Sequence, residues 1–227
     1  MRRQSRPTLL ILLALLVFIP VFAQVKPKPK VAQPSEQLSQ FKRIIAKANL
    51  TFTAPTGFRE IPAIDNEDFT FNYAMDIPGK GFEVWYVVRS QKENWASYNR
   101  AFLNSKSRVA NPDSVYADLG NAQAAAFTDG SNQYFVRTLP PNVLKRYNAD
   151  AGRSYLLNLL DMPETKHYQY ALLVSVQKFH TSTVMMVCFT NQKGPEFYKN
   201  VERAGSSIKF KPAPVNVDKL TERTDEQ

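Results

Sequence analysis

The residues best suited to chemistry in this sequence lie in a polar and aromatic stretch between two apolar segments, residues 147–155 (YNADAGRSY). Its carboxylate, Asp150, and its guanidinium, Arg153, stand three residues apart, and loops between rigid elements are where proteins often place functional groups. The same residue types also build turns, because Asn148 and Asp150 can bond to backbone and Arg153 can pair with Asp150. We favour the structural turn and keep Tyr147, Asn148, Asp150 and Arg153 as candidate ligand-binding residues.

A second candidate pair lies on the mixed face of a predicted strand, residues 82–90, where Trp85 and Arg89 point the same way. The helix expected next carries Trp95 and Tyr98, so an aromatic and basic cluster could form there. Aromatic residues at helical spacing are more often core than site. Packing is therefore the favoured interpretation, and Trp85 and Arg89 are retained as candidate ligand-binding residues.

The usual catalytic and metal-binding residue types are sparse. His167 and His180 lack the short spacings to further ligands that a zinc site needs, so no metal is predicted and both are expected at the surface. Cys188 stands between Val187 and Phe189 and is expected to be buried and unreactive. The chain has 8 glycines and no phosphate-binding glycine motif. We expect no cofactor and no catalytic residue.

One enzymatic alternative stays open. Carboxylates around Asp150 could serve a hydrolase, with Arg153 stabilising developing charge. A cleft that holds Asp150 beside a second acid would support this alternative.

The N-terminus has the features of an export signal. Three arginines, Arg2, Arg3 and Arg6, precede the apolar run of residues 9–19, and Val21-Phe22-Ala23 follows it. We predict a signal peptide over residues 1–23 with cleavage before Gln24, and an uncleaved membrane anchor is the alternative. No cysteine adjoins the cut, so a lipoprotein is not expected. The single cysteine of the chain allows no internal disulfide, which favours a bacterial periplasmic or extracellular location.

Charge and composition limit the partners. The formal net charge is +9, and loss of the three signal arginines would lower it to +6. Residues 24–34 alternate lysine and proline and are expected to form an extended linker, in which Lys26, Lys28 and Lys30 give at most weak contact with an anionic membrane. Basic residues elsewhere are scattered, so nucleic acid is not an expected partner. The expected partner is an unidentified envelope component or protein.

Residues 35–211 are predicted to form one α+β domain built around a hairpin. Two β-rich runs, 168–177 and 183–190, flank a polar connection, and both runs are apolar on both faces. Such strands belong in the middle of a sheet that is covered above and below. The polar residues 212–227 are expected to be a disordered tail.

The other elements follow from periodicity and capping residues. Helices are expected over residues 35–49, from Asn94, from Asp113, from Pro141, and from Pro195 to a cap at Gly205; strands are expected over residues 69–77, 82–90, 133–138 and 207–210. Residues 148–152 are expected to be a loop. Residues 154–160 fit either a helix or a buried strand, because periodicity does not decide between the two.

The order of these elements resembles the PsbP-like family over roughly residues 50–211. The resemblance is carried by a Pro-x-Gly-Phe strand end at residues 55–58, the hairpins, the last helix and the SSIKF strand at residues 206–210. It implies an α/β/α sandwich around a mainly antiparallel sheet, and a non-catalytic accessory or binding role. Metal-binding histidines of some members have no matched positions here. The function expected is therefore an exported non-catalytic binding or accessory domain of the cell envelope.

Overall fold

The computed structural model describes residues 33–104, 110–128 and 134–212. The predicted signal peptide, nearly all of the predicted linker with Lys26, Lys28 and Lys30, and the tail after residue 212 lie outside the described residues. Within the described ranges, none of the helices has the length and hydrophobicity needed to cross a bilayer.

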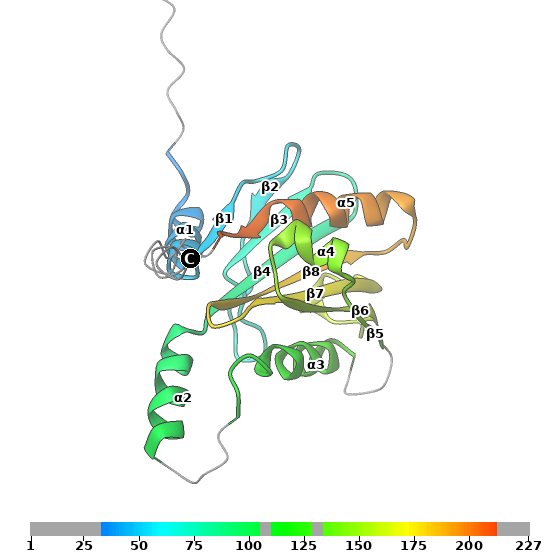
Figure 1. The fold of residues 1–227 in the computed structure, drawn as a ribbon. Helices are drawn as coiled ribbons and strands as arrows, with labels where there is room; N and C mark the ends of the chain where they lie inside the picture. The colour runs from blue at the N-terminus through cyan, green and yellow to red at the C-terminus, as the bar shows by residue number, and fades with distance from the viewer. Residues whose placement is uncertain (1–32, 105–109, 129–133, 213–227) are drawn as a thin grey trace, which may run out of the picture. The chain divides into compact units, whose positions relative to one another are not determined.

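The centre of the fold is a seven-stranded antiparallel sheet with the strand order β2-β3-β4-β8-β7-β6-β5 (Figure 1). Its strands are β2 (Arg59–Ile61), β3 (Tyr73–Ile77), β4 (Phe82–Ser90), β5 (Tyr134–Thr138), β6 (Ala151–Asn158), β7 (Tyr170–Lys178) and β8 (Ser182–Thr190). A separate two-stranded sheet joins β1 (Leu50–Phe52) to β9 (Ile208–Phe210).

The predicted hairpin lies in the middle of this sheet. It consists of β7 and β8, with β6 beyond β7 and β4 beyond β8. All nine residues of β8 are buried. A strand that is covered on both faces must be apolar on both, which is the pattern that identified it in the sequence.

Helices cover both faces of the sheet, so the predicted α+β sandwich is confirmed (Figure 1). The helices are α1 (Glu36–Lys47), α2 (Lys92–Asn104), α3 (Val115–Phe127), α4 (Pro141–Tyr147) and α5 (Pro195–Ser206), with a short 3₁₀ turn, η1 (Pro163–Thr165). Side chains of α1, α4 and α5 pack with Val84 and Tyr86 of β4, on what we call the α5 face. Side chains of α3 pack with Trp85 and Val87, on the opposite α3 face.

The ambiguous segment is a strand, and part of the predicted loop belongs to it. β6 begins at Ala151, because the Asp150 backbone N–H donates to the Gln177 carbonyl (2.9 Å) and starts the pairing with β7. Periodicity within one segment cannot reveal such a partner, since the deciding hydrogen bonds come from a strand elsewhere in the chain.

Three predicted helix boundaries are wrong. α3 begins at Val115 rather than at Asp113, because residues 112–114 form a turn. α2 begins at Lys92 rather than at Asn94, since the Gln91 carbonyl already accepts from the Trp95 N–H (2.9 Å). Gly205 lies inside α5 instead of capping it. A side chain at this position would collide with the hydroxyl of Tyr147, so the glycine permits a close approach of α4.

Candidate functional site

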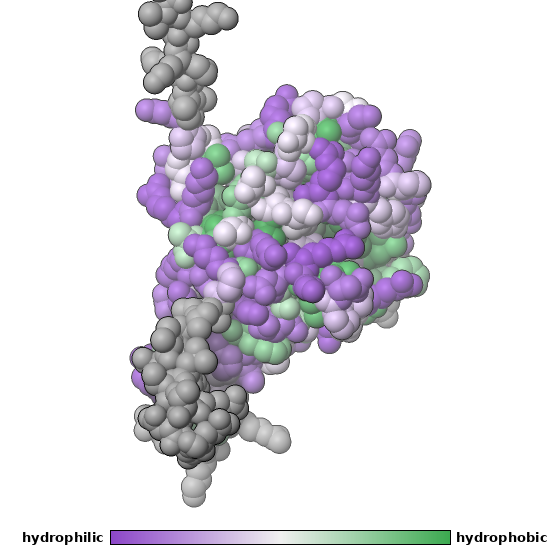
Figure 2. Space-filling view, turned by 45° about the horizontal axis from the view of Figure 1, so that its top comes forward, coloured by the Kyte–Doolittle hydropathy of each residue, from purple (hydrophilic) through white to green (hydrophobic). Residues whose placement is uncertain are grey.

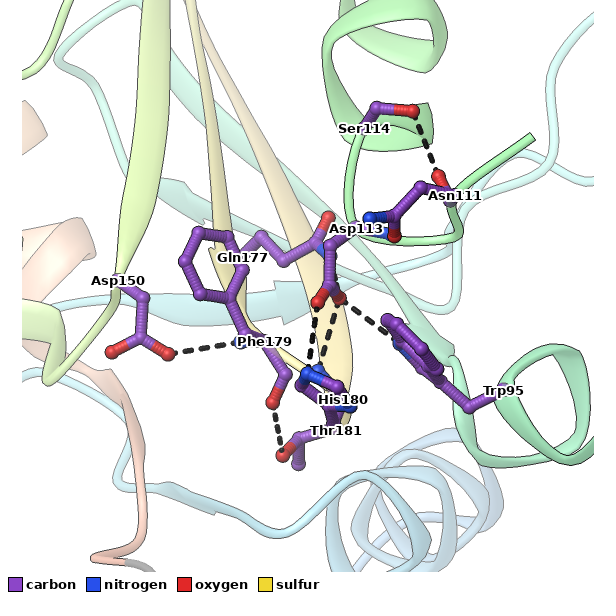
Figure 3. Close-up of polar contacts among 9 residues, drawn as sticks. All are labelled: Trp95, Asn111, Asp113, Ser114, Asp150, Gln177, Phe179, His180 and Thr181. Atoms are coloured by element: carbon purple, nitrogen blue, oxygen red, sulfur yellow. Dashed lines mark hydrogen bonds and ion pairs between the residues drawn. The ribbon is translucent and has the colours of Figure 1, made fainter. Parts of the chain in front are cut away.

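Asp150 lies just before β6 and fastens the turn of the β7–β8 hairpin. Its carboxylate accepts from Lys178 Nζ (2.7 Å) and from the backbone N–H of Phe179 (2.9 Å), the latter drawn in Figure 3. The expected pairing with Arg153 is therefore replaced by a pairing with Lys178. The strand pairing explains this difference, because Ala151, the residue after Asp150, pairs with Gln177, and Lys178 comes directly after Gln177.

The other three residues of this candidate set do not converge on one site. Asn148 ends α4 in the left-handed conformation (φ 54°) and donates from Nδ2 to the Phe210 carbonyl (3.1 Å). Tyr147 is buried on the α5 face, and burial raises the pKa of its phenol well above the ordinary value. Arg153 lies on the α3 face, opposite Ser175 in the ladder. The sheet therefore separates Tyr147 from Arg153.

The second candidate pair is also divided. Trp85 is 1% exposed, and its indole N–H donates to Glu83 Oε2 (3.1 Å) while its ring packs on Phe189 (centroids 4.3 Å apart). Arg89 is exposed near the end of β4, opposite Thr183. The structure thus places Trp85 in the core of the α3 face.

A carboxylate that sequence reasoning did not single out, Asp113, gathers the polar contacts shown in Figure 3. Its Oδ1 accepts from Trp95 Nε1 (3.0 Å), from Gln177 Nε2 (2.7 Å) and from the backbone N–H of His180 (3.0 Å). The Asp113 side chain is only 12% exposed. The residues come from α2, from β7 and its turn, and from the segment before α3, so no local sequence pattern could have connected them.

The Asp113 contacts are those of a structural anchor. The imidazole of His180 stacks on the indole of Trp95 (3.8 Å, 21°) and its Nε2 lies 3.5 Å from Asp113 Oδ2. His180 has positive φ (59°), a conformation that a non-glycine residue keeps only when its surroundings fix it. With three donors already on one oxygen, Asp113 holds the turn in place rather than presenting a free base.

Nothing in the described part of the chain assembles a metal centre, since no three histidine, cysteine or acidic side chains gather around one point. His167 pairs with Asp161 (2.5 Å) at an exposed site. Cys188 is buried, and desolvation raises the pKa of its thiol far above the ordinary value. A buried thiol of this kind is a poor nucleophile and a poor metal ligand.

A groove beside β5 hollows the α5 face, and we call it the β5 groove. One part, of about 230 Å³, lies between α4, α5 and the sheet, and the adjoining part, of about 500 Å³, lies over β5, β6 and β7. The two parts share Ser154, Leu172 and Tyr198. Tyr147 and Arg146 line the inner part, and the outer part is lined further by Phe135, Arg137 and Leu156.

The groove exists because the helices of the α5 face stop short of the sheet edge. Phe135, Leu156 and Leu172 stand directly opposite one another across β5, β6 and β7. The same cross-strand row continues to Cys188 of β8, which is buried. Phe135, at the outer end of the row, is 72% exposed. Figure 2 shows a mainly hydrophilic surface over the helices, with hydrophobic residues exposed toward the side where β5 lies in Figure 1.

Charged groups lie on the rim of the groove. Arg146 of α4 pairs with Glu202 of α5 (2.9 Å). Arg137 also lines the groove and forms no ion pair with any described residue. The arrangement is an apolar floor with a cation at its outer end.

Of the candidate residues predicted from the sequence, Tyr147 alone lines the groove. The available signal in the sequence was the short predicted strand itself, in which Phe135 and Arg137 are two residues apart and therefore share one face. No family model and no curated protein matches this chain.

Proposed function

We propose that this chain is an exported, non-catalytic binding domain of the cell envelope, which holds a small apolar or amphiphilic envelope component in the β5 groove. The predicted export signal and the resemblance to the PsbP-like family support the setting. The observation that carries the binding role is the open apolar groove between α4, α5 and the exposed end of the sheet.

The size and lining of the groove support a small ligand. Ligand pockets have volumes of about 300–1,000 Å³ and are mainly apolar, with a few polar groups that orient the ligand. The two parts of the groove, about 230 and 500 Å³, fall within this range together. Ser154 supplies a hydroxyl where the two parts meet.

The guanidinium of Arg137 adds a preference for a ligand with an anionic group. Because Arg137 has no acidic partner among the described residues, a carboxylate or another anionic group on the ligand can bond to its guanidinium. The proposed ligand class is therefore an amphiphile with an apolar body and one anionic group.

The hydrolase alternative finds no support in the contacts of Asp150. Its carboxylate already accepts from Lys178 and from the Phe179 backbone. It also lines neither part of the β5 groove.

Binding of the fluorescent probe 1-anilinonaphthalene-8-sulfonate, an aromatic amphiphile with one sulfonate, tests the proposal. We expect saturable binding to the folded protein. Ser154→Trp should fill the groove where its parts meet and weaken binding at least tenfold. Asn158→Trp is the matched control, since Asn158 is exposed on the same strand and face outside the groove lining. Absence of saturable binding, or equal binding by both variants, would contradict the proposed site.

A further inference from the structure

The two edges of the seven-stranded sheet differ in their protection. β2 at one edge has three residues, and the carbonyl of its Ile61 accepts from Gln37 Nε2 (2.9 Å). Its Arg59 and Glu60 are charged and are bonded to Asp76 and Ser35. β5 at the other edge has five residues and pairs, among the described strands, with β6 alone. An edge strand with no described partner on its outer side is a template for another strand.

The hydrogen-bond pattern identifies which residues of β5 face outward. Leu139, just after β5, donates its N–H to the Gly152 carbonyl of β6 (3.0 Å). In an antiparallel ladder, bonded and non-bonded pairs alternate, so Phe135 and Arg137 also direct their backbone groups toward β6. The backbone N–H and C=O groups of Tyr134, Val136 and Thr138 therefore point away from the sheet.

The side chains at this edge are unusually apolar for exposed positions. Phe135 is 72% exposed and Val136 is 48% exposed. Arg137, the one charged residue of β5, has no ion-pair partner among the described residues. Sheet edges in monomeric proteins are usually protected by charge, proline or a covering segment.

We propose that this edge binds a second copy of the chain, with the two β5 strands antiparallel about a two-fold axis at Val136. Val136 then faces the partner's Val136, and Tyr134 faces the partner's Thr138. These are the residues whose backbone groups point outward, so every facing pair can exchange two hydrogen bonds. The proposal does not depend on the proposed ligand.

The side chains favour a copy of this strand as the occupant. In the proposed register Phe135 lies opposite the partner's Arg137, on the α5 face and at a non-bonded position, where side chains are closest. Two symmetric cation–π contacts result, and each uses an exposed ring and an unpaired guanidinium. An axis at Arg137 would instead set two guanidinium groups against each other. An axis at Phe135 would set the two Phe135 rings opposite each other and would remove both contacts between Phe135 and Arg137.

The two-fold axis also determines how the two β5 grooves lie relative to each other. A two-fold axis between edge strands runs perpendicular to the sheet, so the α5 face of both copies is on the same side. The two β5 grooves would then lie side by side across the paired strands. The interface is small, so we expect a reversible dimer with a dissociation constant on the order of micromolar.

Sedimentation of the purified protein, expressed as the full chain, tests dimer formation. We expect the mass to rise from monomer to dimer with concentration. Val136→Lys sets like charges opposite each other, and Val136→Pro removes an outward N–H without touching the β6 ladder. Each should shift the midpoint concentration at least tenfold upward, whereas Asn158→Lys, an exposed change on β6, should not.

Cysteine cross-linking tests the register. Directly facing residues have Cα atoms about 5.5 Å apart, within disulfide reach, while residues four positions out of register are roughly 13 Å apart. Under oxidation Val136→Cys should form a disulfide dimer, whereas Tyr134→Cys and Thr138→Cys should each do so only when mixed together. The native Cys188 is buried and serves as an internal blank.

Three results would overturn the proposal. The first is a monomer at every concentration tested. The second is dimerisation that both Val136→Lys and Val136→Pro leave unchanged, and the third is cross-linking of Thr138→Cys alone as fast as Val136→Cys. Native-like circular dichroism of each variant establishes that a lost dimer is not lost folding.

Discussion

Two carboxylates, Asp113 and Asp150, hold the turn of the β7–β8 hairpin through contacts with its backbone. Asp113 accepts from the N–H of His180 and Asp150 accepts from the N–H of Phe179 (Figure 3). Neither carboxylate is close in sequence to the turn residue that it binds. The two contacts fix the hairpin that forms the centre of the sheet.

Replacement of Asp150 by alanine should destabilise the protein. The Phe179 N–H and the Lys178 ammonium both lose their acceptor, at a cost of about 1–3 kcal/mol in the free energy of unfolding. Urea unfolding measures this cost, and Asp68→Ala, at an exposed position, is the control. A stability equal to that of the control would mean that the Asp150 contacts contribute nothing.

The sequence allowed only part of this arrangement to be predicted. Asp150 was expected to bond within a turn, because short polar side chains do so, yet its partner is Lys178 and not Arg153. Asp113 gave no signal beyond that of a helix start. The partners of both residues are set by pairing between distant strands, which residue types and local spacing do not encode.

At the scale of elements, the hairpin was predictable because burial on both faces demands a doubly apolar pattern. α5 was equally clear, since Pro195 begins it and Phe197 and Val201 give it an apolar side. The extent of β6 was not predictable, because its first residues, Ala151 and Gly152, belong to a strand only through their pairing with β7.

The burial of β8 predicts the reactivity of its cysteine. Cys188 is fully buried, and its raised pKa leaves very little thiolate near neutral pH. A thiol reagent at pH 8 should therefore react at least a hundredfold more slowly with the native protein than with the protein in 6 M urea. Comparable rates in the two states would place β8 at an exposed edge.

The contact between α4 and α5 predicts a coupled pair of substitutions. Gly205→Ala adds a methyl group against the Tyr147 hydroxyl and should cost about 1–3 kcal/mol of stability, despite the better helix propensity of alanine. In a Tyr147→Phe background the hydroxyl is absent, so the same change should cost much less. Thermal unfolding of the four proteins measures the coupling, and additive effects would contradict the contact.

At the scale of the whole molecule, the sequence predicts processing that lies outside the described residues. The arginines, the apolar run and Val21-Phe22-Ala23 predict cleavage after Ala23 during export. N-terminal sequencing of the exported protein should begin at Gln24. A membrane-bound product that retains Met1 would instead support the uncleaved anchor.

The fold class was predictable from the sequence, whereas the β5 groove was not. The sandwich follows from the alternation of strands and helices and from the doubly apolar hairpin. The groove depends on how far α4 and α5 extend over the sheet, and the two helices meet where Tyr147 lies against Gly205. Helix lengths can be estimated from a sequence, but the area of sheet that they leave open cannot.

The pairing of β8 with β4 also determines when, during synthesis, the sheet can form. Residues 91–181 separate the two strands, so β4 leaves the ribosome long before its neighbour exists. Until then Val84, Tyr86 and the other buried side chains of β4 have no partner strand on that side. High contact order of this kind slows folding. A nascent chain that is released before β8 is complete therefore exposes the buried side chains of β4, and the sheet closes only after β8 has been synthesised.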